Sequence, residues 1–151
     1  FCSGFNDGLA AGGGTGSVLQ LPATAFGDAT AVAQAVRAHL LQNPDIDAMF
    51  AIGDGDTNAT VSGIAQAGKA GQVHVCGMNF NDSILNNIQQ GTQDCAIDQQ
   101  GYQQGFFAVS ILNNYVTYGV TIPTREILTG PGVIDSSNVE LVMAGVKAGA
   151  R

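Results

Sequence analysis

Polar and aromatic side chains stand directly after several short apolar runs of this chain, and their types suit a hydroxyl-rich ligand. In chain order they are Phe26 after residues 17–21, Asp54 and Asp56 after 46–52, Asn79 after 73–76, and Asp98 and Gln99 after 95–97. Carboxylates and amides hydrogen-bond hydroxyl groups, and an aromatic ring covers the apolar face of such a ligand. These side chains can cooperate only if the fold brings them to one place.

The apolar runs alternate with stretches of helical periodicity, which is typical of βα units. The run 46–52, broken only by Asp47, is too short for an independent helix and predicts a buried strand. Similar runs predict strands at residues 17–21, 73–76, 95–97 and 127–128. The sequence therefore predicts an α/β fold: an open, mostly parallel, doubly wound sheet of about five strands with helices on both faces. Parallel strands end at one edge, so the candidate residues should share a rim.

Capping residues and apolar spacing mark the helices between these strands. Asp28 is the predicted N-cap of a helix that runs to about Gln42. Asn81 or Asp82 is the predicted N-cap of another helix, which closes at Gly91. Residues 1–11 are predicted to form the end of a helix, and further helices are predicted in the stretch that ends at Gly68 and over residues 102–118 before Gly119.

The candidate residues also have simpler interpretations. Asp54, and still more Asp56, could be helix caps on an exposed turn, because each precedes a helical stretch. Asn79 could be a turn residue and Gln99 a solvent-exposed amide. The argument for function comes from their joint placement at successive strand ends.

Metal and catalytic chemistry have little support. Asp54, Asp56 and Asn58 imitate the start of a calcium loop, but alanines occupy the sixth and twelfth positions, where Gly and Glu are needed. We therefore assign no metal ligand, no cofactor and no catalytic residue. His39 and His74 lie inside elements and are interpreted as structural. A small α/β enzyme with Asp54 or Asp98 as a base is kept as an alternative.

Composition narrows the class of protein further. The 151 residues suit one domain. Five basic residues are scattered among twelve acidic ones, which argues against a nucleic-acid partner. No apolar run approaches the roughly 20 residues that span a bilayer, so the chain is not expected to be membrane-embedded. At most one internal disulfide can form from Cys2, Cys76 and Cys95, and buried free thiols are the favoured interpretation of the last two.

An ordered series of motifs resembles the C-terminal lobe of the type I periplasmic sugar-binding proteins. The motifs are Gly4-Phe5-x-Asp7-Gly8-Leu9, Pro44-Asp45-Ile46-Asp47-Ala48-Met49-Phe50-Ala51-x-Gly53-Asp54, Val73-x-Val75-x-Gly77-x-Asn79, Ile88-x-x-Gly91, Ala96-Ile97-Asp98-Gln99 and Tyr102-x-x-Gly105. The resemblance implies one lobe at residues 1–138 and a C-terminal tail at 139–151. It also implies an N-terminal lobe that this chain lacks, with a sugar held between the lobes.

The resemblance assigns roles to four ligand-binding residues. Phe26 matches the ring that stacks on the sugar, and Gln99 matches a glutamine that binds hydroxyl groups. Asn79 stands where the family usually has Asp, so it can donate as well as accept. Asp54 matches the acid of an Asn-Asp pair, but Gly53 replaces the Asn.

The resemblance further implies a non-enzymatic solute-binding protein, periplasmic or extracellular, that feeds an ABC transporter permease or a receptor. The alternative is an effector-binding lobe of a sugar-responsive transcription regulator or sensor ectodomain. The segment Ile127–Asp135 would cross between lobes, so here it is expected either to dock on this sheet or to contact another chain.

Overall fold

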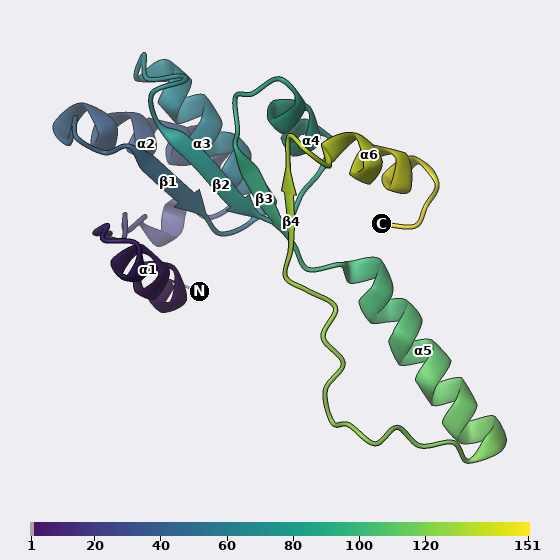
Figure 1. The fold of residues 1–151 in the computed structure, drawn as a ribbon. Helices are drawn as coiled ribbons and strands as arrows, with labels where there is room; N and C mark the ends of the chain where they lie inside the picture. The colour runs from purple at the N-terminus through teal and green to yellow at the C-terminus, as the bar shows by residue number, and fades with distance from the viewer. Residues whose placement is uncertain (1) are drawn as a thin grey trace.

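The computed structural model describes residues 2–151; Phe1, where the predicted lobe begins, lies outside the described residues. The helices are α1 (Cys2–Ala11), α2 (Ala29–Gln42), α3 (Asp54–Gln66), α4 (Asp82–Gln89), α5 (Gly101–Tyr118) and α6 (Val139–Lys147), with a short 3-10 turn at Ala23–Ala25. The strands are β1 (Ala48–Ala51), β2 (His74–Met78), β3 (Cys95–Asp98) and β4 (Gly132–Asp135). Figure 1 shows their arrangement.

The sheet has the strand order β1-β2-β3-β4. β1, β2 and β3 are parallel, and β4 runs antiparallel to β3. The predicted open, mostly parallel α/β sheet is therefore confirmed, although with four strands in place of about five. The predicted helix caps are also confirmed: the Asp28 side chain accepts from the N–H groups of Thr30 and Ala31, and Asn81 caps α4.

Two predicted strands are wrong. Residues 17–21 join no ladder, although Leu19 and Leu21 pack against the apolar core. Residues 127–128 are irregular, and the last strand forms instead at Gly132–Asp135. The two errors have different causes: Leu19 and Leu21 pack on the core from an extended segment that joins no ladder, whereas Ile127 and Leu128 are 44% and 82% exposed. An apolar run does not by itself specify a strand.

The main core lies on one face of the sheet, in two clusters. α2 and α3 cover β1 and β2, whereas α4 and α6 cover β3 and β4 (Figure 1). The largest fully buried apolar side chains are Leu40, Val75, Ile84, Leu85, Ile88 and Ile134. The predicted tail contributes to the second cluster, because Val139 and Val142 of α6 are buried there.

The other face of the sheet carries α1 and a disulfide. Phe5 of α1 stacks on Phe50 of β1 with ring centroids 4.9 Å apart. Cys76 and Cys95 are paired residues of β2 and β3, and their sulfur atoms are bonded. The favoured interpretation of these cysteines as free thiols is therefore wrong. Their register places both side chains on the same face, which the sequence could not reveal.

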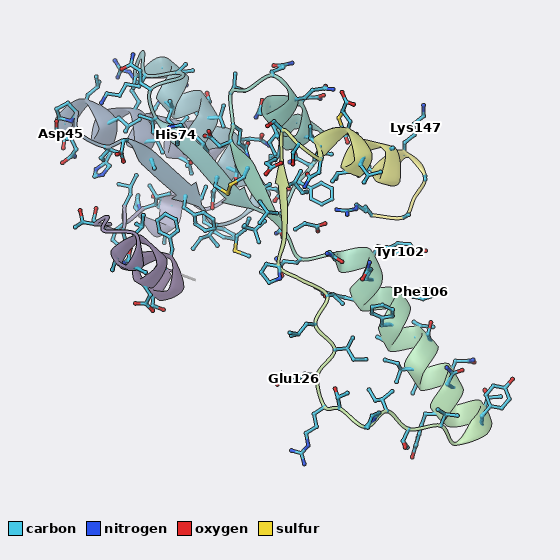
Figure 2. The ribbon with its side chains drawn as sticks, viewed as in Figure 1. Asp45, His74, Tyr102, Phe106, Glu126 and Lys147 are labelled. Carbon is cyan, nitrogen blue, oxygen red and sulfur yellow. A yellow bond between two sulfur atoms is a disulfide. The ribbon has the colours of Figure 1, made fainter. Side chains whose placement is uncertain are left out.

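α5 leaves the sheet after β3 and has no buried residue (Figure 1). Its apolar stripe is mostly exposed: Phe106, Val109, Leu112 and Val116 are 56%, 69%, 61% and 73% accessible. Tyr102 and Phe106 stack on each other along the helix with centroids 6.3 Å apart (Figure 2). The helix itself was predicted correctly, but its stripe packs on nothing in residues 2–151.

The segment after α5 returns to the sheet. Of the two fates expected for Ile127–Asp135, docking on this sheet is the one observed, because its last residues form β4. None of the helices in residues 2–151 has the length and apolar character that crossing a membrane requires.

Candidate functional site

Asn79 and Gln99 meet at the carboxyl edge of the sheet. Asn79 follows β2 directly, and its N–H donates to the carbonyl of Ile97 in β3 at 2.8 Å. Gln99 follows β3, and its Nε2 donates to Asn79 Oδ1 at 2.6 Å. Both side chains are exposed. Two of the four predicted ligand-binding residues therefore lie in direct contact, at the exits of neighbouring strands.

Asp54 lies beside the same loop. The Nδ2 of Asn81 donates to Asp54 Oδ2 at 3.3 Å, while Asn81 Oδ1 accepts from Ile84 N–H and caps α4. Asn81 thus links the acid after β1 to the loop after β2. The geometry joins Asp54, through one asparagine, to the loop that carries Asn79.

The capping role considered for Asp54 and Asp56 is wrong. α3 begins at Asp54, so both acids lie in its first turn, and the N-cap is Gly53, whose φ is +112°. The glycine-rich turn is shorter than the sequence suggested, because Gly53 adopts a conformation that few other residues reach. Carboxylates in a first turn still favour the helix through its dipole.

Phe26 stands apart from the other three residues. It follows the turn Ala23–Ala25, just before the N-cap Asp28 of α2, and 97% of its surface is accessible. No contact described in residues 2–151 ties its ring to Asp54, Asn79 or Gln99. An aromatic side chain so exposed is free to lie against a ligand.

A cavity of about 340 Å³ opens at this edge between β3, the start of α5 and the C-terminal segment. Its lining residues are Asn79, Phe80, Asp98, Gln99, Gln100, Gly101, Tyr102, Gln103, Gln104, Ala150 and Arg151. Asn79 and Gln99 therefore belong to the cavity wall, whereas Phe26 and Asp54 do not. The wall is rich in amides, which both donate and accept hydrogen bonds.

Asp98 is a buried residue of the cavity lining. Its side chain is 6% exposed, with Oδ1 accepting from Gln100 N–H at 2.6 Å and Oδ2 accepting from Arg151 Nη1 at 2.7 Å. Sequence reasoning placed Asp98 on the rim but missed Gln100, Gln104 and Arg151. Arg151 lies 53 residues from Asp98, so no local signal connects the two.

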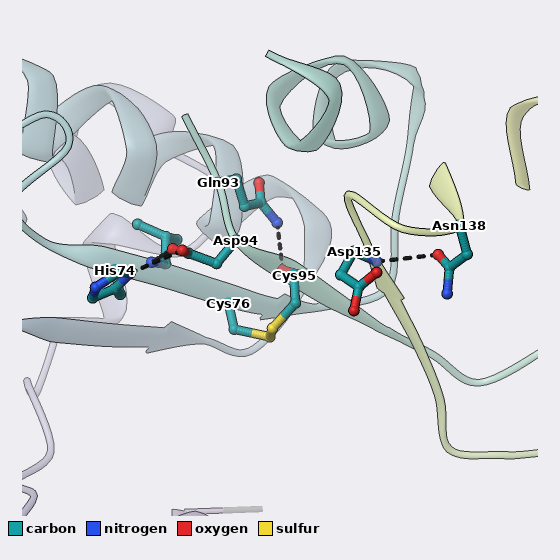
Figure 3. Close-up of a disulfide and its surroundings, with 8 residues drawn as sticks. His74, Cys76, Gln93, Asp94, Cys95, Asp135 and Asn138 are labelled. Atoms are coloured by element: carbon teal, nitrogen blue, oxygen red, sulfur yellow. Dashed lines mark hydrogen bonds and ion pairs between the residues drawn. A yellow bond between two sulfur atoms is a disulfide. The ribbon is translucent and has the colours of Figure 1, made fainter. Parts of the chain in front are cut away.

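A second polar cluster lies at the opposite end of β2. His74 Nδ1–H donates to Asp94 Oδ1 at 2.8 Å, and Asp94 Oδ2 accepts from Val75 N–H at 2.7 Å (Figure 3). The hydrogen bond to Asp94 raises the pKa of His74, and the carboxylate charge adds to that effect. Partial burial by itself raises the pKa of Asp94, but the hydrogen bonds from His74 and Val75 hold this pKa below its ordinary value. This pair is distant from the strand exits and forms no part of the candidate site.

Within residues 2–151, no three His, Cys, Asp or Glu side chains gather closely enough to hold a metal ion. What the candidate site offers is hydrogen bonding: amide donors and acceptors from Asn79, Gln99 and Gln104, with the Asp98 charge neutralised by Arg151. Such a set recognises neutral polar groups such as hydroxyls.

Comparisons with known proteins agree with this geometry. A family model described as the periplasmic binding protein domain matches residues 1–119. A curated xylose/arabinose-binding protein, XylF, from Sulfolobus acidocaldarius is 28% identical over 111 residues, which cover 70% of this chain and 28% of that protein.

Solved structures are similar in fold and in part in sequence. A carbohydrate transporter from Acidothermus cellulolyticus, in complex with myo-inositol, has a TM-score of 0.71 and 33% identity, covering 82% of this chain and 43% of that one. An ABC transporter solute-binding protein from Agrobacterium vitis, bound to α-D-tagatopyranose, has a TM-score of 0.75 and 30% identity. The match covers 91% of this chain and 45% of that protein. The chain thus spans less than half the length of each of these three relatives.

Proposed function

Because this chain belongs to the periplasmic binding protein domain family, we propose that it is one lobe of a two-lobed protein that binds a small polyhydroxylated ligand, a sugar or a sugar-like polyol, without enzymatic chemistry. The observation that carries the proposal is the contact of Gln99 with Asn79 on the wall of the 340 Å³ cavity. That contact brings two amides from different strands to one point at the sheet edge where ligands of open α/β sheets bind.

The chemistry of the site suits hydroxyl groups. Each amide of the Asn79 and Gln99 pair keeps hydrogen-bonding capacity after their mutual bond, so a ligand hydroxyl can donate to one and accept from the other. Asp54 adds an acceptor from the neighbouring strand exit. Phe26 supplies an exposed ring for the apolar face of a sugar. We propose these four residues as the ligand contacts of this lobe.

The lobe proposed for residues 1–138 presents only one wall of the site. Its relatives are more than twice as long, and the apolar stripe of α5 is exposed. A second lobe that packs on this stripe would bury it and also face the amides across the cavity. We propose that this second lobe is the partner that completes the site, and that residues 139–151 extend the first lobe.

The relatives are described as transporter components, which supports delivery of the ligand to an ABC transporter outside the cytoplasm. In the alternative, a regulatory effector lobe, the same site would bind the ligand but binding would control transcription or signalling in place of transport. Attachment of a DNA-binding segment to the lobe would favour that alternative. Turnover of a sugar that is lost in Asp54→Asn would favour the enzyme alternative.

The proposal is tested by calorimetric titration of the 151-residue chain with millimolar myo-inositol, D-tagatose, D-xylose and L-arabinose. Loss of one hydrogen-bonding side chain should weaken binding about tenfold, so Asn79→Ala and Gln99→Ala are the informative variants. Gln34→Ala, on the exposed surface of α2, is the matched control and should bind as the unchanged chain does. Absence of heat with all four compounds, or equal affinity in all three variants, would contradict the proposal.

A further inference from the structure

The Asp98 carboxylate holds the backbone next to a ligand residue. Its Oδ1 accepts from Gln100 N–H at 2.6 Å, and Gln100 itself has a left-handed φ of +55°. Asp98 is in turn fixed in β3, where it pairs with Gly132 of β4. Gln99 therefore stands between two fixed residues, and its side chain can reach Asn79 only while that turn keeps its shape.

The Asp98 carboxylate depends on Arg151. The Asp98 side chain is 6% exposed, and Arg151 Nη1 donates to its second oxygen at 2.7 Å. A buried carboxylate that loses its cation is strongly destabilised and moves toward water. That movement displaces the oxygen that accepts from Gln100.

The chain after α6 is shaped to deliver this arginine. Gly149 adopts a left-handed φ of +69°, and the N–H of Ala150 donates to the carbonyl of Gly145, which turns the chain back along the helix. A Cβ at Gly145 would lie 3.4 Å from Cγ and Cδ of Arg151, so the arginine stem lies close against the bare backbone of Gly145. Arg151 therefore approaches Asp98 along a defined path.

We propose that Arg151 is a positioning residue of the ligand site, which acts through Asp98 and Gln100 to hold the Gln99 amide against Asn79; its role in ligand affinity rests on the function proposed above. The arginine need not touch the ligand. It sets the shape of the turn from which Gln99 projects, although it lies 52 residues later in the sequence.

The first measurement needs no ligand. In NMR spectra of the 151-residue chain, Arg151→Gln should shift the backbone amide signal of Gln100 and the side-chain amide signals of Gln99. The control Lys147→Gln changes an exposed residue at the end of α6 and should shift neither set of signals. Thermal unfolding verifies that each variant is folded. Where Arg151→Gln does not fold, Arg151→Lys, which keeps the charge but not the planar fork, is measured instead and should shift the same signals less. Unchanged Gln99 and Gln100 signals in a folded variant would overturn the proposal.

The second measurement separates positioning from a general loss of stability. Asp98→Asn keeps an acceptor for Gln100 N–H and removes the charge, so the double variant Asp98→Asn/Arg151→Gln should restore the Gln99 and Gln100 signals that Arg151→Gln loses. With myo-inositol or D-tagatose, Arg151→Gln should bind about tenfold more weakly and the double variant within about threefold of the unchanged chain. Failure of the double variant to restore the signals would overturn the proposal, whereas absence of sugar binding in the unchanged chain contradicts only the proposed function.

Discussion

Asn79 and Gln100 are the non-glycine residues of the described chain with positive φ, at +63° and +55°. Each lies just after a strand that ends at the candidate site, and such backbone conformations cost roughly 1–2 kcal/mol for ordinary residues. Asn tolerates this conformation because its short side chain can bond locally, whereas Gln does so less readily. Gln100 is held there by the Asp98 carboxylate, so local strain at the site is stabilised by a specific contact.

The His74 and Asp94 pair predicts a defined pH dependence of stability. The pKa of His74 is raised above its unfolded value of 6.5, so its contribution is complete below about pH 6.5 and is lost as the pH rises through the folded pKa. The pKa of Asp94 is lowered below its unfolded value of 3.8, so its contribution is present above that value and is lost as the pH falls through the folded pKa. The pair therefore stabilises the fold most between about pH 4 and pH 6.5.

Melting temperatures measured from pH 3 to pH 9 check this expectation. His74→Gln should remove the fall in melting temperature that the unchanged chain shows above about pH 6.5. Asp94→Asn should remove that fall and also the fall in melting temperature below about pH 4. The effect should be small, because both side chains are largely exposed. An unaltered pH profile in both variants would show that the pair contributes nothing measurable.

At the scale of elements, close approach between helices is set by a single glycine. A Cβ at Gly63 of α3 would lie 2.6 Å from the carbonyl oxygen of Ala33 and 2.7 Å from Cβ of Val36, both in α2. α2 and α3 can therefore pack at this distance only because residue 63 has no side chain. The contact in turn helps to hold α3, whose first residue is Asp54, against α2.

Two alanine substitutions in α3 check this packing. Gly63→Ala should reduce the free energy of unfolding by about 1–3 kcal/mol, because the added methyl group must displace α2. Gly55→Ala is the matched control in the same helix, since a Cβ there would meet nothing within 4 Å. It should be neutral or stabilising by up to about 1 kcal/mol. Equal effects of the two changes in urea unfolding would contradict the close packing.

The disulfide joins the two strands whose exits carry Asn79 and Gln99. It closes a loop between residues 19 apart, and a loop of this length corresponds to about 3 kcal/mol of stabilisation. Reduction, or Cys76→Ser with Cys95→Ser, should lower the free energy of unfolding by about this amount. The double variant itself should not respond to reductant, and Cys2→Ser, at the exposed free cysteine, should unfold as the unchanged chain does.

Local signals made much of the fold predictable. Asp28 and Asn81 cap helices because their short side chains reach N–H groups two or three residues away, and such contacts are visible in sequence. Residues 127–128 misled the strand prediction because apolar character does not report ladder bonds. The ion pair of Arg151 with Asp98 and the disulfide of Cys76 with Cys95 depend on strand register and long-range folding. No rule of local residue spacing predicts either contact.

At the scale of the whole molecule, α5 differs from α2, α3, α4 and α6, each of which contributes buried side chains to the core. Leu112 of α5 is 61% exposed, whereas Leu85 of α4 is 1% exposed. The helix therefore contributes little to the stability of the lobe. Its apolar stripe has a use only if something outside residues 2–151 covers it.

A pair of leucine substitutions checks this view. Leu85→Ala should cost about 2–5 kcal/mol in chemical unfolding, because it leaves a cavity in the core. Leu112→Ala should cost less than about 0.5 kcal/mol, as exposed substitutions usually do. A comparable loss at Leu112 would mean that α5 packs against this lobe in solution.

The antiparallel pairing of β3 with β4 has a consequence for how the chain can be shortened. Asp98 and Gly132 already lie opposite each other, so α5 and its return segment form an excursion that begins and ends at adjacent backbone positions. A tight Asn-Gly reverse turn could replace residues 99–131 and convert the two strands into an ordinary hairpin. The pairing of β3 with β4 thus holds the two ends of the excursion side by side at one edge of the sheet.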